Sequence, residues 1–213
     1  MKPVVVKSAR DLVAERLREE IYVGNLKPGQ ELVQDRISEE LGVSRMPVRE
    51  ALLLLESAGL IEICKNKRAI VKQITPAGVK EHLEIRAILE GHAAIKACRK
   101  APDFSQLHQI MDEFRNEEAE DVSHFRTLNT QFHFTIWKLA DSPRLQQMLE
   151  QLWYAMPSAY PLNPIENFRR NKEQHAKILA ALDARDEDAA YQAVTTHIAK
   201  TEDLVLARLN QIL

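Results

Sequence analysis

Apolar residues recur at intervals of three and four along most of the chain, which predicts a mainly helical protein because such positions share one face of an α-helix. Only the stretch near residues 60–74 departs from this spacing, and two short strands are expected there. The predicted elements of this first part are a helix from a capping box at Ser8–Asp11 to Gly24, a helix at 34–41, a helix from its cap Ser44 to Gly59, and strands at 61–63 and 69–72.

Beyond Thr75-Pro76, which is a helix-start signal, the same spacing predicts six further helices and no strand. Their expected ranges are 76–100, 103–118, 121–140, 143–156, 164–183 and 186–211. We therefore expect a mostly α protein with two domains, 1–74 and 75–213, of which the second is an all-α antiparallel bundle of six helices.

Composition narrows the class of protein. The 213 residues are 45% hydrophobic and carry 29 basic and 31 acidic side chains, so any surface for nucleic acid must be local. Cys64 and Cys98 lie far apart and exclude a disulfide framework. No apolar run approaches the roughly 20 residues that span a bilayer, so a soluble, cytoplasmic protein is expected, with no membrane partner.

The first domain has the spacing of a winged helix-turn-helix unit. Arg45 and Arg49 share one face at the start of its third helix, and arginine can pair bidentately with guanine in the major groove. The hairpin tip adds Lys65, Lys67 and Arg68, which suit the DNA backbone or minor groove. Taken singly, each of these residues is better explained as a solvated surface charge, but together they favour DNA binding.

Three segments, Leu26–Gly29, Gly42–Leu52 and Leu55–Leu60, closely resemble the DNA-binding domain of GntR-family bacterial transcription regulators. The resemblance implies a homodimer that reads a short inverted repeat in double-stranded DNA. The residues that it assigns to DNA binding are Arg36, Ser44, Arg45, Met46, Arg49, Lys65, Lys67 and Arg68. The chain departs from the usual pattern at three places: Asp35 replaces a DNA-contacting arginine, Met46 a threonine, and Arg68 a wing-tip glycine.

Histidines mark the second domain, which holds all seven of them. Asn129 and His133 lie one helical turn apart, and His175 and His197 lie on the apolar faces of two helices joined by a short link. Three histidines that face one interior can bind a divalent cation. The alternative is that each is a hydrogen-bonded core residue.

Residues 76–211 look like the FCD ligand-binding domain of FadR-type GntR regulators, through the segment Glu84–Glu90, Phe132-His133 and the spacing of His175 and His197. The expected number of helices suggests the VanR-like subgroup. The resemblance implies a bundle that senses small organic acids with a zinc or nickel ion bound by an Asp and three His.

By position, the metal ligands that this resemblance implies are Asn129, His133, His175 and His197. Asn129 stands where the family has Asp, and its neutral carbonyl oxygen is a weaker ligand for a dication. The resemblance also makes Arg86 a partner for an effector carboxylate, while a salt bridge to Glu84 or Glu90 is its alternative.

These patterns predict a sequence-specific DNA-binding transcription regulator, a repressor rather than an enzyme, whose operator affinity a small carboxylate modulates. Two other functions stay open at this point. A metal-dependent enzyme would use the same histidines, although the sequence shows no evident general acid or base beside them. A constitutive DNA-binding dimer would have a purely structural bundle.

Overall fold

The computed structural model describes residues 8–116, 122–156 and 164–212. The chain divides into two compact units, Met1–Thr75 with Trp153–Pro157 and Pro76–Leu152 with Ser158–Leu213. The end of one bundle helix therefore groups with the first unit.

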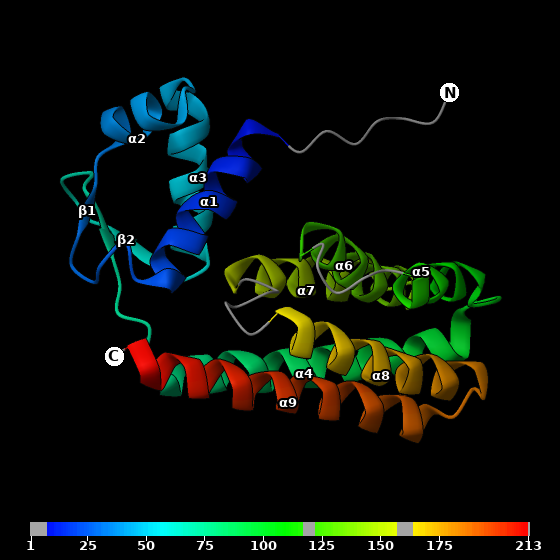
Figure 1. Ribbon diagram of the computed structural model, residues 1–213. Coiled ribbons are helices and arrows are strands. Elements are labelled where there is room, and N and C mark those ends of the chain that lie inside the picture. Colours follow the sequence, from blue (N-terminus) through cyan, green and yellow to red (C-terminus); the bar gives the residue numbers. More distant parts are fainter. Residues whose placement is uncertain (1–7, 117–121, 157–163, 213) are drawn as a thin grey trace. The chain divides into compact units, whose positions relative to one another are not determined.

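The first unit combines three helices with a small antiparallel sheet (Figure 1). Its elements are α1 (Ala9–Val23), β1 (Glu31–Leu32), α2 (Gln34–Leu41), α3 (Arg45–Ser57), β2 (Ile61–Ile63) and β3 (Ala69–Val71). The strand order is β1-β3-β2, with Glu31 opposite Ile70 and Glu62 also opposite Ile70 on the other side. The hairpin that connects β2 to β3 is the wing.

The core of this unit lies between α1 and α3, because each helix buries one apolar face. The buried residues are Val13, Ala14, Leu17 and Ile21 of α1 and Val48, Ala51, Leu52 and Leu55 of α3. Since this packing uses one side of α3, Arg45 and Arg49 remain exposed on the helix. The geometry thus leaves the basic end of α3 open to a partner.

Local signals predicted most boundaries of this unit, with four differences, one of which is that β3 ends at Val71 and not at Lys72. The structure adds β1, a two-residue strand that the sequence did not predict. α3 ends at Ser57, before Gly59. Ser44 occupies the cap position of α3 in extended backbone, but its side chain makes no capping hydrogen bond, so the expected capping contact is wrong.

The second unit is entirely helical in the part of the chain that the structure describes. Its helices are α4 (Pro76–Lys100), α5 (Ser105–Asn116), α6 (Val122–Leu139), α7 (Pro143–Ala155), α8 (Pro164–Asp183) and α9 (Glu187–Ile212). The prediction of a mostly α protein with a helical bundle is confirmed. None of the described helices is long and apolar enough to cross a membrane.

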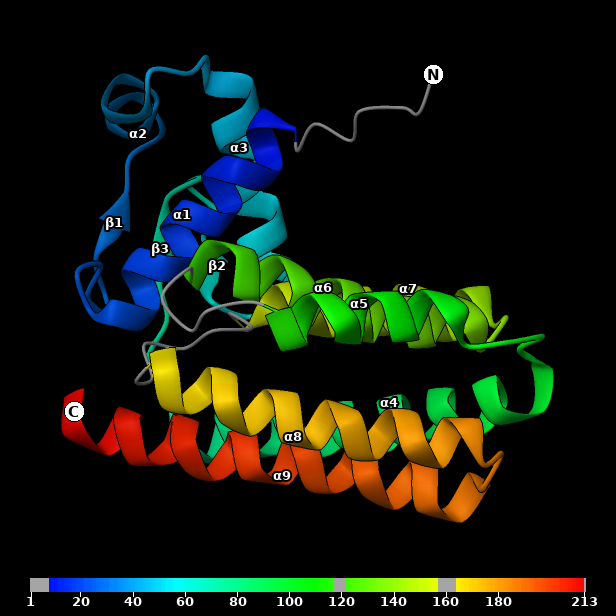
Figure 2. The ribbon, with the colours of Figure 1, turned by 45° about the vertical axis from the view of Figure 1, so that its right-hand side comes forward.

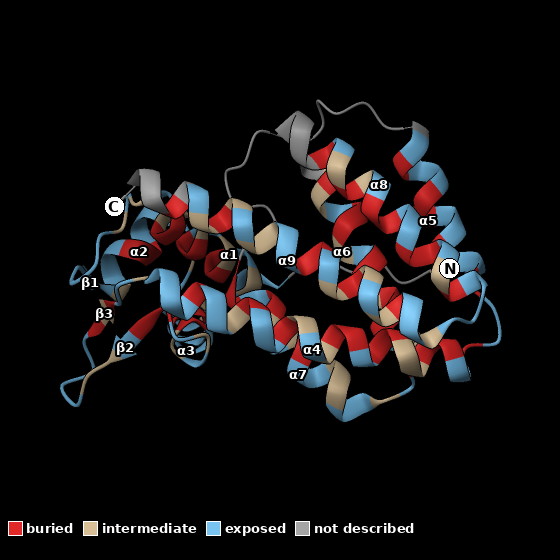
Figure 3. Cartoon of the chain, turned by 90° about the horizontal axis from the view of Figure 1, so that it is seen from below, coloured by how far each residue is buried: buried red, intermediate tan, exposed pale blue. Residues whose placement is uncertain are grey.

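Four helix contacts position the interior of this bundle. α4 lies along α9, α8 packs against α9, and α6 contacts both α4 and α5 (Figures 1 and 2). Buried positions recur along the helices of the bundle where they face one another (Figure 3). The short link between α8 and α9 makes these two helices antiparallel neighbours, as expected.

Candidate functional site

Three histidines meet inside the bundle, one from each of α6, α8 and α9. One ring nitrogen from each of His133, His175 and His197 lies within 4.8 Å of the others. The three side chains are almost fully buried, with 1%, 0% and 4% exposure respectively. Nitrogen ligands at this spacing form a set that can close around a single divalent cation.

Aromatic packing fixes the ring of His175. The ring of Phe132 stacks on it with a centroid distance of 4.1 Å and an angle of 7°, and Phe114 meets it edge-on at 5.4 Å. Phe132 directly precedes His133 on α6, so one helix supplies both a candidate ligand and the support for another. Such support reduces the conformational freedom that metal binding would otherwise have to remove.

Two polar side chains hold the other two imidazoles through their Nδ1 atoms. Nδ1 of His133 lies 2.7 Å from Oε2 of Glu90, and Nδ1 of His197 lies 2.6 Å from Oε1 of Gln174. Because a carboxylate and an amide oxygen accept hydrogen bonds, both Nδ1 atoms act as donors, and in the neutral form of either ring the lone pair lies on Nε2. This is the usual arrangement of a metal-binding histidine and its supporting residue.

Polar atoms of His175 and Asn129 are buried in the bundle without a hydrogen bond to any described residue. Among the described residues, neither ring nitrogen of His175 makes a hydrogen bond, and neither does Oδ1 of Asn129. Buried polar atoms in folded proteins are nearly always satisfied, so each orphaned atom calls for an explanation. A cation bound by the imidazoles and the Asn129 carbonyl oxygen would satisfy Oδ1 of Asn129 and one of the two ring nitrogens of His175, and the donor set fits a zinc-like or nickel-like ion.

The protonation of the cluster also favours a cation. Burial lowers the pKa of His175 well below its usual value, and the charge of His133 lowers it further. Burial likewise lowers the pKa of His197, followed by the charges of the other two histidines. Both imidazoles are therefore neutral at pH 7, which is the form that binds metals.

Among the described residues, Glu90 is the buried carboxylate. Burial alone would raise its pKa, but the charges of Arg86 and His133 and its hydrogen bonds to both lower the pKa to about 2. Nε of Arg86 donates to Oε1 of Glu90 over 2.5 Å, one helical turn away on α4. A buried chain thus runs from the guanidinium through Glu90 to His133.

The predicted site residues of the bundle therefore do not all belong to the histidine cluster. His133, His175 and His197 come together, and Asn129 is buried one turn before His133 on α6. Arg86 is buried and makes the salt bridge to Glu90 that was its alternative interpretation. Sequence reasoning missed Glu90 and Gln174 as the partners of two histidines. The i,i+4 spacing of Arg86 and Glu90 was the one available signal.

The predicted DNA-binding residues form an exposed set on the first unit. Ser44, Arg45, Met46 and Arg49 are exposed at the start of α3, with Met46 at 62%. Lys65, Lys67 and Arg68 are exposed in the wing, where Lys67 has a φ of 64°. Arg36 on α2 is also exposed and pairs with Glu40.

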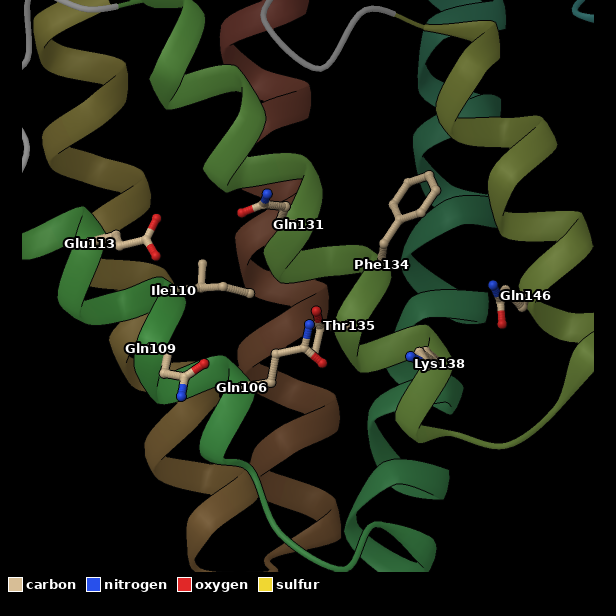
Figure 4. Close-up of a pocket in the computed structure, with 9 residues that line it drawn as sticks. All are labelled: Gln106, Gln109, Ile110, Glu113, Gln131, Phe134, Thr135, Lys138 and Gln146. Atoms are coloured by element: carbon tan, nitrogen blue, oxygen red, sulfur yellow. The ribbon is translucent and has the colours of Figure 1, made fainter. Parts of the chain in front are cut away.

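A separate groove lies on the second unit, mainly between α5 and α6 (Figure 4). It encloses about 400 Å³ and is lined by Gln106, Gln109, Ile110, Glu113, Gln131, Phe134, Thr135, Lys138 and Gln146. The charged residues of this lining, Glu113 and Lys138, have opposite signs. Its chemistry is thus mostly that of neutral amides, and the histidines of the cluster are not part of it.

Comparison with known proteins matches one known domain to each of the two units. Residues 9–71 match the family of bacterial regulatory proteins called the gntR family, and residues 81–200 match the FCD domain. The chain belongs to the GntR family of transcription regulators. All the basic residues described above on α2, α3 and the wing lie within the first match, and the three histidines lie within the second.

Among its relatives, this GntR regulator is 31% identical to the HTH-type transcriptional regulator McbR of Escherichia coli, over 83% of either chain. It is 29% identical to the HTH-type transcriptional repressor RspR of the same species, over 89% of this chain and 85% of RspR. The solved structure of E. coli McbR/YncC superposes with a TM-score of 0.75 at 26% identity, covering 96% of this chain and all (100%) of that one. These likenesses confirm the GntR and FCD assignments.

Proposed function

We propose that this GntR regulator is a metal-containing, metabolite-responsive repressor that acts as a homodimer. The domain 1–74 binds an inverted repeat in DNA, and the domain 75–213 binds the effector and forms the dimer. The observation that supports this most directly is the buried cluster of His133, His175 and His197, in which His175 has no hydrogen-bond partner among the described residues. A bundle that served only as a scaffold would gain nothing from burying such atoms unsatisfied.

The proposed metal ligands are the three histidines and the carbonyl oxygen of Asn129. A zinc or nickel ion bound there would supply Lewis acidity and open coordination positions for a carboxylate. With neutral ligands only, the ion would keep its full charge, which favours an anionic effector as the group that completes the site. Arg86 adds a buried positive charge, which Glu90 already balances.

The effector changes operator affinity by changing the spacing of the two DNA-binding domains of the dimer. Half-sites lie at fixed distances along the duplex, so a small rotation costs affinity. A coupling free energy of about 1–3 kcal/mol suffices for a roughly 5- to 150-fold change in operator affinity. A carboxylate that binds only one of the two arrangements supplies such a coupling.

Metal content is the first test. Untagged protein purified without chelator should contain about one zinc or nickel ion per chain by elemental analysis, and His175→Ala should lose it. His92→Ala is the matched control, because His92 is exposed on α4 and lies outside the cluster. Protein that binds no metal after supplementation with zinc and nickel would contradict the proposal and leave a constitutive DNA-binding dimer as the better function.

DNA binding has its own test, which is independent of the metal. Arg45→Ala or Arg49→Ala should cost about 1–3 kcal/mol of operator binding if the lost contact is to a base. Lys67→Ala should weaken binding to all duplexes alike and reduce the salt dependence by about one unit of slope, because its partner is a phosphate. An Arg45→Ala variant with unchanged affinity for every duplex would exclude α3 as the reading helix.

A further inference from the structure

An exposed ion pair connects the two helices of the helix-turn-helix. Arg45 is the first residue of α3, and Asp35 lies in the first turn of α2. Nε of Arg45 lies 2.6 Å from Oδ1 of Asp35, and their side chains are 72% and 54% exposed. The pair therefore lies on the same open surface as the start of α3, where DNA is proposed to bind.

The geometry of the pair leaves part of the guanidinium for a second partner. Arginine has five N–H donors in a planar fork, and Asp35 engages the Nε donor. The terminal nitrogens can still donate together to O6 and N7 of a guanine. A carboxylate at Nε restricts the rotation of the side chain, so less conformational entropy is lost when the base contact forms.

Asp35 also changes the electrostatics of this surface. A carboxylate beside the proposed DNA contact repels phosphates and offsets the charge of Arg45, which lowers the sequence-independent part of the affinity. Arg45 then contributes little to DNA affinity unless its terminal nitrogens donate to a guanine edge, which replaces the water that hydrates them. Both effects increase the preference for the operator over other sequences and lower the affinity for DNA in general.

A second exposed ion pair on α2 provides a contrast. Nε of Arg36 lies 2.7 Å from Oε1 of Glu40, one helical turn along the same helix, and this pair does not include a residue of α3. Removal of Glu40 or Asp35 deletes one negative charge from α2. Removal of Glu40 releases Arg36, which is itself a predicted DNA-binding residue, and removal of Asp35 releases Arg45. The two effects are told apart by the base pair at which each variant loses discrimination.

We propose that Asp35 is a positioning residue that determines specificity: it orients Arg45 for a guanine contact and suppresses binding to other sequences. This inference rests on the proposed function of Arg45 as a base-reading residue. It assigns a role to an acidic side chain within a basic DNA-binding surface. Its test must therefore separate the orientation of Arg45 from the simple loss of a charge.

The experiment compares Asp35→Ala, Glu40→Ala, Arg45→Ala and the double variant Asp35→Ala/Arg45→Ala in the full-length protein. An operator duplex is first selected from a random pool by the unaltered protein, and a scrambled duplex of the same composition serves as reference. Affinities are measured for both duplexes over a range of salt concentrations, and for operators with each base pair changed in turn. Thermal unfolding establishes that every variant is folded.

Both single acidic variants should bind the scrambled duplex more tightly, because each removes a negative charge. Asp35→Ala should also lower the ratio of operator to scrambled affinity, by about two- to five-fold, which is the range expected for an exposed ion pair. The loss should fall on the same base pair that Arg45→Ala affects, whereas any loss in Glu40→Ala should fall on a different one. In the double variant, the loss of Asp35 should cause no further drop in this ratio.

The outcomes separate the proposed role of Arg45 as a base-reading residue from the proposed role of Asp35. If Arg45→Ala leaves the ratio unchanged, the proposed reading by Arg45 is wrong. If Arg45→Ala lowers the ratio but Asp35→Ala behaves like Glu40→Ala at the base pair that Arg45→Ala affects, Asp35 contributes only charge and this inference is overturned. A further drop in the double variant would also overturn it, since Asp35 would then act without Arg45.

Discussion

Glu90 of α4 is buried between Arg86 of the same helix and His133 of α6. It accepts hydrogen bonds from Arg86 and from Nδ1 of His133, and it is 2% exposed. The pKa of its carboxyl is lowered to about 2, since the attraction of Arg86 and His133 exceeds the cost of burial. A single carboxylate thus balances a buried cation and orients a candidate metal ligand.

Replacing this carboxylate should weaken metal binding without removing a ligand. For Glu90→Gln we expect the affinity for zinc to fall by about 10- to 100-fold, as for other residues that support a metal-binding histidine. Competition with a chelator of known affinity measures this change. Glu84→Gln is the matched control, because Glu84 is exposed on the same helix and pairs with Lys80.

The same substitution should also lower stability, since it leaves Arg86 buried without a full negative charge. The expected cost is about 3–5 kcal/mol in the free energy of unfolding of the metal-free protein. Double substitution with Arg86→Met removes the unpaired charge and should recover much of that stability while zinc affinity stays low. A folded Glu90→Gln variant with normal zinc affinity would show that Glu90 does not orient His133.

Among the helices, α4 and α9 approach closely where α4 has a glycine. A β-carbon on Gly91 would lie 2.6 Å from Cδ2 of Tyr191 and 3.2 Å from Cγ2 of Thr195. The absence of a side chain therefore allows α9 to pack against this part of α4. The contact matters for the site because α4 carries Glu90 and α9 carries His197.

Gly91→Ala should destabilise the protein although alanine favours helix. Overpacking costs about 1–3 kcal/mol and the gain in helix propensity returns about 1 kcal/mol, so a net loss of about 1 kcal/mol is expected. In a Tyr191→Ala background the same substitution should instead stabilise. Gly78→Ala, at an exposed position of α4, is the control and should stabilise in both backgrounds. Chemical denaturation measures the free energy of unfolding of each variant. If Gly91→Ala stabilises the protein in the wild-type background, Tyr191 moves aside at little cost.

Prediction from sequence succeeded for the helices because their signals are local. The glycine stops Gly24 and Gly42 both adopt left-handed backbone, with φ of 84° and 64°, and end the helices where expected. The strand β1 was missed because its two residues become a strand only by pairing with β3, almost forty residues later. An element of that length carries no periodicity of its own.

For the site, the sequence predicted which histidines share an interior, because each lies on an apolar helix face. It did not predict that Glu90 contacts His133, since this contact depends on how α4 packs against α6. The same holds for Arg45 and Asp35, whose pairing depends on the angle between α2 and α3. Contacts between helices follow from tertiary packing, which one sequence does not reveal.

At the scale of the whole molecule, the buried histidines make folding depend on pH. Three imidazoles have lowered pKa values. Burial and the charge of Arg86 lower the pKa of His82 to about 4. The pKa values of His175 and His197 lie well below their usual value, mainly because both rings are buried. Unfolding returns each to a pKa of about 6.5, so below that pH the unfolded chain binds more protons than the native one.

The free energy of unfolding of the metal-free protein should therefore be constant above about pH 7 and fall as the pH drops below about 6.5. Each imidazole that stays neutral in the native state contributes a slope of about 1.4 kcal/mol per pH unit. His175→Phe should reduce the total slope between pH 6 and pH 5 by about that amount, because phenylalanine keeps the stacking on Phe132 and does not titrate.

Zinc should add stability that does not depend on the titration of these imidazoles. Because His175 and His197 are already neutral in the native state, zinc displaces no proton from them, and the rise in the unfolding temperature on addition of zinc should persist at pH 5.5 as well as at pH 7.5. In His175→Phe this rise should largely disappear at both values. A wild-type slope that persists unchanged in His175→Phe would mean that this imidazole already holds a proton in the native state. Since a protonated imidazole cannot bind a metal ion, that result would contradict the neutral cluster on which the metal site is built.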